Sequence, residues 1–186
     1  MQDTAPPTSD TRYAGEAVLF GAAPNRFLAS QSARLRRGWS ALAVADGEGR
    51  NGVRMAEQGL AVLSIDASAV AQAKARRLAV SRRVDLQFEL ADLETRRFPQ
   101  ATFDVVAGIF IQLEGYRPEQ LAYGAGGPRI TENLDTEAML RDAFADFEIL
   151  ELNAYDAVIE EGAGHRGMSA LIDLAARAPC PDQNQG

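Results

Sequence analysis

The sequence predicts an open α/β fold built on a mostly parallel, twisted sheet, and three observations predict it. Residues 41–45 (ALAVA) are apolar throughout, as expected for a parallel strand that is covered on both faces. Three glycines follow at G-x-G-x-x-G spacing and open a helical stretch. A second apolar run, residues 61–65, then ends in an acid. This order of strand, turn, helix and strand is the β-α-β unit of Rossmann-like folds.

The glycine turn is a candidate ligand site. Gly47, Gly49 and Gly52 lack a Cβ atom, so the backbone can turn tightly, and free N–H groups at the start of the next helix can face a ligand. Asp66 follows the second strand, where a carboxylate can accept hydrogen bonds from both hydroxyls of a ribose. The alternative is a plain β-α-β turn, because the glycine spacing alone is a weak signal. The complete order of elements favours nucleoside binding.

Further elements surround this unit, with helices expected on both faces of the sheet. They are, in chain order, a helix over 26–35, a helix capped by Ser68, strands over 84–90 and 103–110, a helix over 134–144, and an antiparallel strand pair, 147–155 and 169–177, around a loop over 160–167. The helix after Ser68 carries basic residues, Lys74 among them, that are predicted to face solvent.

Composition limits the class of protein. The chain has 186 residues, 46% of them hydrophobic, which suits one domain with a sizeable core. We expect a disordered tail over 1–11, a single domain over 12–178 and a polar tail over 179–186. The net charge of −7, from 26 acids and 19 bases, argues against a nucleic-acid surface. The sequence shows neither a signal peptide nor a membrane span, so a cytoplasmic location and a small-molecule substrate are expected.

Two other polar residues are candidates for a functional site. Asp92 follows the strand 84–90 at its carboxyl end, where open α/β sheets bind ligands, although a surface acid would look the same. His165, the only histidine, lies in a glycine-rich loop and is a candidate for catalysis, with a structural role as the alternative. One histidine cannot make a metal site, so no metal is expected.

Four segments resemble the successive motifs of class I S-adenosylmethionine-dependent methyltransferases, namely ADGEGRNG, SIDAS, ADLE and FDVVAGIF. The lead-in RYAGEAVLFGAAPNRFL and the later GYRPEQLAYGAGGP and GAGHRGMSALIDLAAR resemble the tellurite-resistance and thiopurine-type branch. The resemblance covers residues 13–177. It implies S-adenosyl-L-methionine as the cofactor.

By the family's pattern, this cofactor would lie along the glycine turn and the carboxyl ends of the strands. The implied contacts are Gly47 and Gly49 with the methionine part, Asp66 with the ribose, Asp92 and Leu93 with the adenine, and Asn51, Ala67 and Ile109 to complete the set. Residues 109–112 would line the methyl-donor pocket. Tyr13, Phe20 and Asn25 would form an N-terminal lid, and Tyr13 is the second candidate for catalysis.

The chain departs from the family's pattern after Gln112, where a helix and a fifth strand are missing. A parallel crossover needs a dozen or more residues with a helix, and residues 111–133 hold no helical period beyond a turn near 119–122. We therefore expect one over-long strand over 103–116. A strand without its neighbour exposes backbone groups and apolar surface, so a homodimer, intertwined or domain-swapped, is expected with this segment in its interface.

The sequence thus predicts a methyltransferase that uses S-adenosyl-L-methionine on a small molecule. The sulfonium is already an activated methyl donor, so the protein needs no nucleophile of its own and can act by positioning and by excluding water. One alternative is a degenerate member of the fold that binds the cofactor or only dimerises, with a regulatory or structural role. A second, an NAD-dependent oxidoreductase, is supported by the glycine pattern alone.

Overall fold

The computed structural model describes residues 9–93, 95–99, 102–109, 115–123, 131, 134–162 and 165–179, without the side chains of Ser9 and His165. The described chain divides into two compact units. Unit 1 is Met1–Ile109 with Glu161–Gly164, and unit 2 is Phe110–Glu160 with His165–Gly186. Whether the two units form the single domain over 12–178 stays a prediction.

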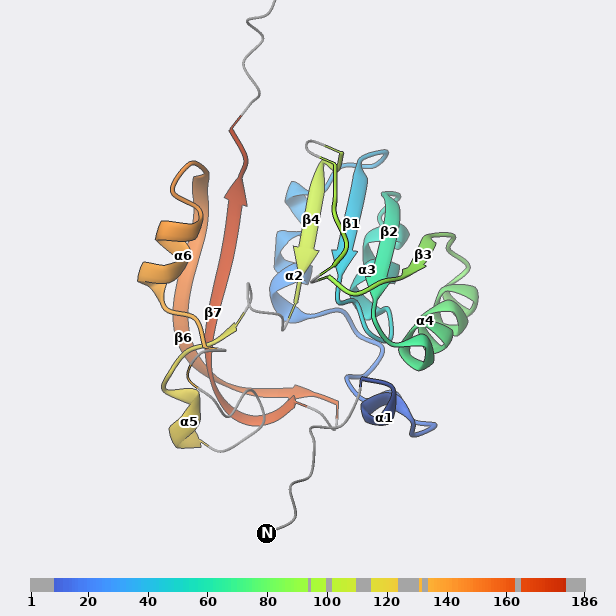
Figure 1. Cartoon of the computed structure of the whole chain (residues 1–186), viewed down its shortest axis with the longest axis horizontal. Coiled ribbons are helices and arrows are strands. Elements are labelled where there is room, and N and C mark those ends of the chain that lie inside the picture. Colours follow the sequence, from blue (N-terminus) through green and yellow to red (C-terminus); the bar gives the residue numbers. More distant parts are fainter. Residues whose placement is uncertain are drawn as a thin grey trace, which may run out of the picture. The chain divides into compact units, whose positions relative to one another are not determined.

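Unit 1 contains a four-stranded parallel sheet with the order β3-β2-β1-β4 (Figure 1). Its strands are β1 (Ser40–Val44), β2 (Ala61–Asp66), β3 (Gln87–Leu90) and β4 (Val105–Gly108). The first strand therefore lies inside the sheet, as it does in Rossmann-like folds. The predicted Rossmann-like, mostly parallel sheet is confirmed.

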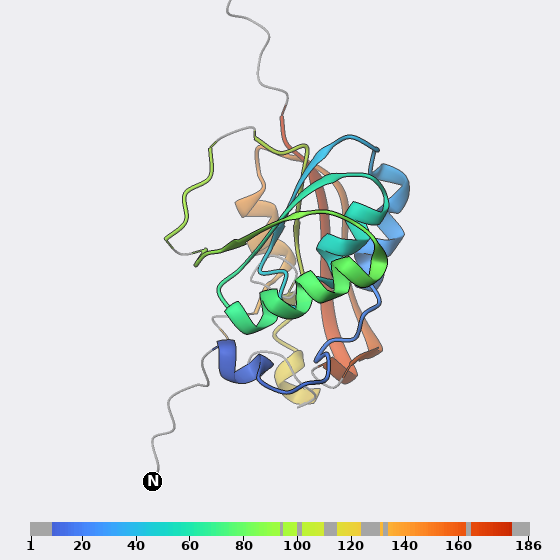
Figure 2. The same ribbon diagram turned by 90° about the vertical axis from the view of Figure 1, so that its right-hand side faces the viewer.

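The helices of unit 1 are α1 (Ser9–Tyr13), α2 (Arg26–Ser30) with the 3₁₀ helix η1 (Gln31–Arg34), α3 (Arg50–Glu57) and α4 (Ala69–Arg82). Residues of α2, α3 and α4 share one hydrophobic core with one face of the sheet, formed by Leu28, Val53, Met55, Ala79, Ala41, Ala43, Val62 and Ala107 among others. Figure 2 shows α3 and α4 on one side of the strands and the connection from β3 to β4 on the other.

Local sequence sets the ends of these helices. Asn25 caps α2, because its Oδ1 accepts a hydrogen bond from the N–H of Phe27 at 2.9 Å. Ser68 caps α4, since its Oγ accepts from the N–H of Ala71 at 3.1 Å. Arg83 ends α4 in the left-handed region, at φ 57°. The predicted helix starts at Asn25 and Ser68 are thus confirmed.

Two predicted boundaries in unit 1 need correction. Residues 9–11 were expected in a disordered tail, but they belong to α1, which Asp10 ties to the start of α4. The strand predicted from 84 begins at Gln87 instead. The reason is that the N–H of Val84 still bonds to the carbonyl of Ala79, 3.1 Å away, and closes the end of α4.

The predicted over-long strand over 103–116 is also wrong. β4 ends at Gly108, which pairs with Val44, the last residue of β1. Beyond that point β4 has no further partner in β1, and Ile109 is no longer part of a strand. Residues 110–114 of the predicted strand lie outside the described residues.

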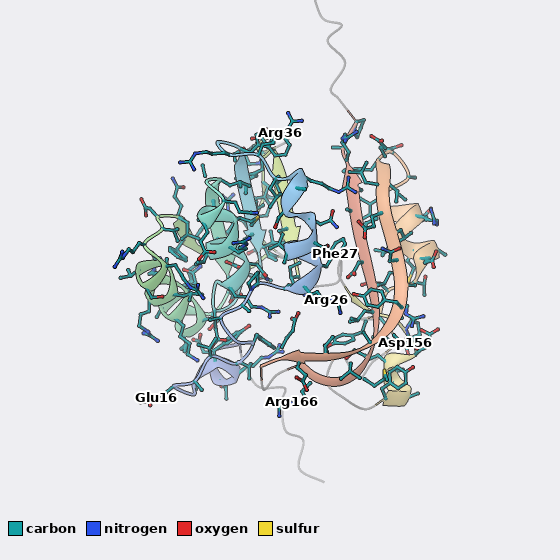
Figure 3. All side chains as sticks on the ribbon, turned by 180° about the vertical axis from the view of Figure 1, so that it is seen from behind. Glu16, Arg26, Phe27, Arg36, Asp156 and Arg166 are labelled. Carbon is teal, nitrogen blue, oxygen red and sulfur yellow. The ribbon has the colours of Figure 1, made fainter. Side chains whose placement is uncertain are left out.

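Unit 2 contains a second sheet with the order β5-β7-β6. Its elements are β5 (Gly115–Tyr116), α5 (Gln120–Tyr123), α6 (Glu137–Ala143), β6 (Glu148–Glu161) and β7 (His165–Arg177). β5 runs antiparallel to Leu171 and Ile172 of β7. On the surface of this unit, the carboxylate of Asp156, labelled in Figure 3, accepts a hydrogen bond from the Tyr123 hydroxyl at 2.7 Å.

The predicted antiparallel C-terminal pair is confirmed, with longer strands than expected. β6 runs to Glu161 and β7 begins at His165, so the predicted loop over 160–167 is mostly strand. The preceding helix is shorter than the predicted 134–144. Thr136 caps it by accepting from the N–H of Met139 at 3.2 Å, and Leu134 is buried ahead of the cap.

Candidate functional site

The glycine turn joins β1 to α3 and requires residues without a side chain. Gly47 and Gly49 take left-handed φ angles of 56° and 86°. A Cβ atom at Gly49 would lie 2.6 Å from the Cβ of Ala75, because α4 passes directly against the turn. A Cβ atom at Gly47 would lie 2.9 Å from the hydroxyl oxygen of Tyr13. Gly49 thus permits α4 to pack against the turn. Gly47 instead lies against Tyr13 of the N-terminal segment, which is residues 10–25.

Asp66 connects the end of β2 to this turn. Its Oδ2 accepts a hydrogen bond from the N–H of Gly47 at 2.8 Å, and its Oδ1 accepts one from the N–H of Ser68 at 2.8 Å. Burial raises the pKa of the Asp66 carboxyl, and the two backbone hydrogen bonds act against that rise. The predicted turn and its predicted acid therefore lie in contact and form one structural unit.

Asp46 is a second buried acid of the turn and is not among the residues predicted from the sequence. Its Oδ2 accepts a hydrogen bond from the Ser64 hydroxyl at 2.7 Å, and its Oδ1 accepts one at 3.1 Å from the N–H of Gly52, in the first turn of α3. Burial raises the pKa of Asp46 to about 6. Gly52 is needed here because a Cβ atom would lie 2.3 Å from the Asp46 carboxylate. An acid directly before the first glycine was the available signal.

The N-terminal segment lies on the turn. Tyr13 is buried beside Gly47, and its ring meets that of Phe20 edge to face at 6.3 Å. Burial, and next the charge of Asp66, raise the pKa of Tyr13 to about 12. Asp10 accepts a hydrogen bond from the Ser68 hydroxyl at 2.6 Å, at the N-terminus of α4. Figure 1 shows α1, in dark blue, near the carboxyl ends of the strands of unit 1.

A buried ion pair holds the second half of this segment. The Nζ of Lys74 lies 2.8 Å from the Oε1 of Glu48, with both side chains at most 7% exposed. Glu48 also accepts from the N–H of Leu19 at 2.7 Å, and Lys74 donates to the carbonyl of Ala17 at 2.9 Å. The prediction that Lys74 faces solvent is therefore wrong, because a partner distant in sequence draws it inward.

A second set of contacts joins this segment to α3 and to Glu161. Arg50 pairs with Glu161 at 2.5 Å and donates to the carbonyl of Phe20 at 3.0 Å. Asn51, predicted from the resemblance to contact a cofactor, uses its Oδ1 to accept from the N–H of Asn25 at 2.9 Å. The implied lid residues Phe20 and Asn25 are thus attached to the first turn of α3.

The remaining predicted site residues fall at different places. Asp92 is exposed after β3, close to Asp66 in the sheet, since the N–H of Ala91 bonds to the carbonyl of Asp66 at 3.2 Å. Leu93, Ala67 and Ile109 complete the predicted set. Leu93 is half-buried, Ala67 is exposed, and Ile109 packs against the hydrophobic core of unit 1. The side chain of His165 and residues 110–112 lie outside the described residues.

Within the described residues, no cluster of three or more His, Cys, Asp or Glu side chains could hold a metal ion. In the same parts of the chain, no helix is both long and apolar enough to cross a membrane.

The parallel sheet with its glycine turn is an open α/β fold, and comparisons with known proteins narrow the type of fold. Residues 41–124 match the family described as "Methyltransferase domain". No protein of curated function matches the chain. The match covers the glycine turn, Asp66 and Asp92.

Several solved structures share the fold. One, described as "Conversion of a Disulfide Bond into a Thioacetal Group during Echinomycin Biosynthesis", is 21% identical with a TM-score of 0.64, over 91% of this chain and 90% of that one. TehB from Haemophilus influenzae is 16% identical with a TM-score of 0.63, over 90% of this chain and 65% of its own. A methyltransferase from Thiobacillus denitrificans, in complex with S-adenosyl-L-homocysteine, is 16% identical with a TM-score of 0.59, over 82% of this chain and 76% of its own. The chain has the fold of class I S-adenosylmethionine-dependent methyltransferases, as its sequence predicts.

Proposed function

We propose that the chain is a methyltransferase that binds S-adenosyl-L-methionine at the glycine turn and methylates a small molecule. The observation that carries this proposal is the hydrogen bond between Asp66 and the N–H of Gly47, which joins the turn to the acid at the carboxyl ends of β1 and β2. In this fold that edge is where nucleotides bind. The similar protein from Thiobacillus denitrificans holds S-adenosyl-L-homocysteine, which supports the same ligand class here.

The residues of the turn suit such a cofactor. Each oxygen of Asp66 accepts one backbone N–H, and a carboxylate oxygen has two lone pairs, so each keeps an acceptor position for a ribose hydroxyl. Gly47 offers bare backbone beside it. Asp46 and Asp66 make the turn acidic, since Glu48 is paired with Lys74, and this charge favours a ligand that carries sulfonium and ammonium groups.

When bound, S-adenosyl-L-methionine supplies a methyl group that is already activated by its sulfonium. The chain itself has to hold the two reactants in line and to exclude water. Tyr13 and Phe20 cover the turn, and the pair between Glu48 and Lys74 fixes the backbone that carries Phe20. We therefore assign to the predicted lid, Tyr13, Phe20 and Asn25, the role of covering the turn and excluding water.

We assign Tyr13 to covering and hydrogen bonding, not to proton abstraction. Its pKa is raised to about 12, so the phenol stays protonated at neutral pH and is a poor general base. An acceptor that loses its own proton readily, such as a thiol, would not need such a base. The net charge of −7 further favours a small molecule over a nucleic acid as the methyl acceptor.

The proposal is tested by measuring transfer. The purified chain is incubated with S-adenosyl-L-methionine and single acceptors of four classes, namely thiols, phenols, amines and carboxylates, and S-adenosyl-L-homocysteine is quantified by mass spectrometry. We expect acceptor-dependent product with at least one class, and its loss in the Asp66→Ala variant. Cofactor binding without product for any class would instead favour a cofactor-binding protein with a regulatory role.

A further inference from the structure

Asp46 is a buried carboxylate whose oxygens are held by neutral donors. It lies directly before Gly47 in the glycine turn and is 8% exposed. One oxygen accepts from the Ser64 hydroxyl in β2, and the other accepts from the N–H of Gly52 in α3. A hydroxyl and a backbone amide solvate a carboxylate but carry no opposite charge. The negative charge of Asp46 is therefore stabilised without being neutralised.

Asp46 forms no ion pair with any residue that the structure describes. The buried cations of α3 and α4 have other partners. Arg50 lies 2.5 Å from Glu161, and Lys74 lies 2.8 Å from Glu48. A buried charge without its own counter-charge costs free energy. The turn thus favours a ligand that brings a positive charge to it.

The charge of the sulfur is what separates S-adenosyl-L-methionine from S-adenosyl-L-homocysteine. The sulfur is a cationic sulfonium in the first and a neutral thioether in the second, and the two differ by one methyl group. The ribose, the adenine and the amino acid part are the same, so hydrogen bonds to them contribute alike to both ligands. A buried negative charge discriminates, because electrostatic attraction acts beyond direct contact and is strong where water is excluded.

We propose that Asp46 is a specificity-determining residue, whose negative charge strengthens the binding of S-adenosyl-L-methionine relative to that of S-adenosyl-L-homocysteine. In methyl transfer, a lone pair of the acceptor forms the new bond to carbon, and the proton of the acceptor leaves to solvent. The electron pair of the broken S–CH3 bond stays on sulfur and cancels its charge. The attraction to Asp46 is then lost, which assists product release. This inference rests on the proposed function and adds to it how substrate and product are told apart.

The preference should depend on pH, because Asp46 carries its charge only when ionised. Burial raises the pKa of Asp46 to about 6 against its two hydrogen bonds, while the charge of Asp66 in β2 raises this pKa and that of Arg50 in α3 lowers it. Two other groups border the turn. Lys74 of α4 is in its ion pair, and the phenol of Tyr13, with its pKa raised to about 12, stays neutral. Discrimination should therefore weaken as the pH falls through about 6.

The test measures the dissociation constants of both ligands by calorimetry and follows their ratio. Asp46→Asn removes the charge, and its amide can still accept from Gly52 and donate to the Ser64 oxygen. At neutral pH this variant is expected to shift the ratio toward S-adenosyl-L-homocysteine about three- to tenfold. A purely structural role of Asp46 would weaken both ligands alike and leave the ratio unchanged. Asp85→Asn removes an exposed acid at the amino end of the sheet and should keep the wild-type ratio.

Two further measurements do not depend on the folding of Asp46→Asn. The wild-type ratio should move toward S-adenosyl-L-methionine as the pH rises from about 5 to about 7.5. Ser64→Ala removes a hydrogen bond that lowers the pKa of Asp46, so the same change should occur at higher pH.

The outcomes separate this inference from the proposed function. A wild-type ratio that is constant over this pH range, or equal ratios for the wild type and a folded Asp46→Asn variant, would overturn the role of Asp46 and leave the proposed function in place. A folded wild-type chain that binds neither ligand would overturn both.

Discussion

Replacing Asp66 with alanine is expected to weaken the binding of S-adenosyl-L-homocysteine about tenfold or more. The carboxylate is proposed to accept hydrogen bonds from the ribose, and loss of a charge-assisted pair costs about 1.5 to 3 kcal/mol. The substitution also removes the acceptor of the Gly47 and Ser68 N–H groups, which shape the turn. Isothermal titration calorimetry measures the change, and thermal unfolding shows whether the fold is retained.

Two variants make this result interpretable. Asp66→Asn keeps one carbonyl acceptor without the charge, so its affinity should fall between wild type and Asp66→Ala. Asp85→Ala removes an exposed acid ahead of β3, at the amino end of the sheet, and should bind like wild type. Equal affinities for wild type and Asp66→Ala would show that Asp66 is not the ribose ligand.

Replacing Lys74 with methionine is expected to destabilise unit 1 by about 3 to 5 kcal/mol, because it leaves the carboxylate of Glu48 buried without its cation. The double variant Glu48→Gln with Lys74→Met should be less destabilised than Lys74→Met alone, since no charge then remains buried. Urea unfolding gives these free energies. The N–H of Leu19, which bonds to Glu48, should also exchange faster in the single variant.

Arg82→Met, also in α4, is the control for the loss of side-chain length and positive charge. Arg82 pairs with Glu57 at 3.8 Å on an exposed surface, so its loss should cost less than about 1 kcal/mol. Similar costs for Lys74→Met and Arg82→Met would mean that the pair between Glu48 and Lys74 does not anchor the N-terminal segment.

The sequence predicted the elements whose signals are local. The apolar run 41–45, the glycine spacing and the acid at Asp66 each depend on neighbouring residues, and the structure has the strand, turn and helix in that order. Caps at Asn25 and Ser68 are likewise read from one or two residues. Such signals hold because the backbone geometry of a turn or a helix start restricts which residues fit there.

The sequence could not predict features that depend on contacts between distant positions. Helical periodicity placed Lys74 on a solvent face, but its partner Glu48 lies in the preceding β-α turn. The end of β4 at Gly108 is set by the length of its partner β1, and not by the apolar run that continues to Phe110. Asp46 was not predicted, because its role as a hydrogen-bond acceptor appears only when the donors Ser64 and Gly52 are brought beside it.

The central claim is that the glycine turn and Asp66 form a binding site for S-adenosyl-L-methionine. Calorimetric titration of the wild-type chain with S-adenosyl-L-homocysteine, and with NAD as the competing nucleotide, tests it most directly. We predict saturable binding of one S-adenosyl-L-homocysteine per chain and no heat of binding with NAD. Binding of NAD in its place, or no binding of S-adenosyl-L-homocysteine by a folded chain, would contradict the claim.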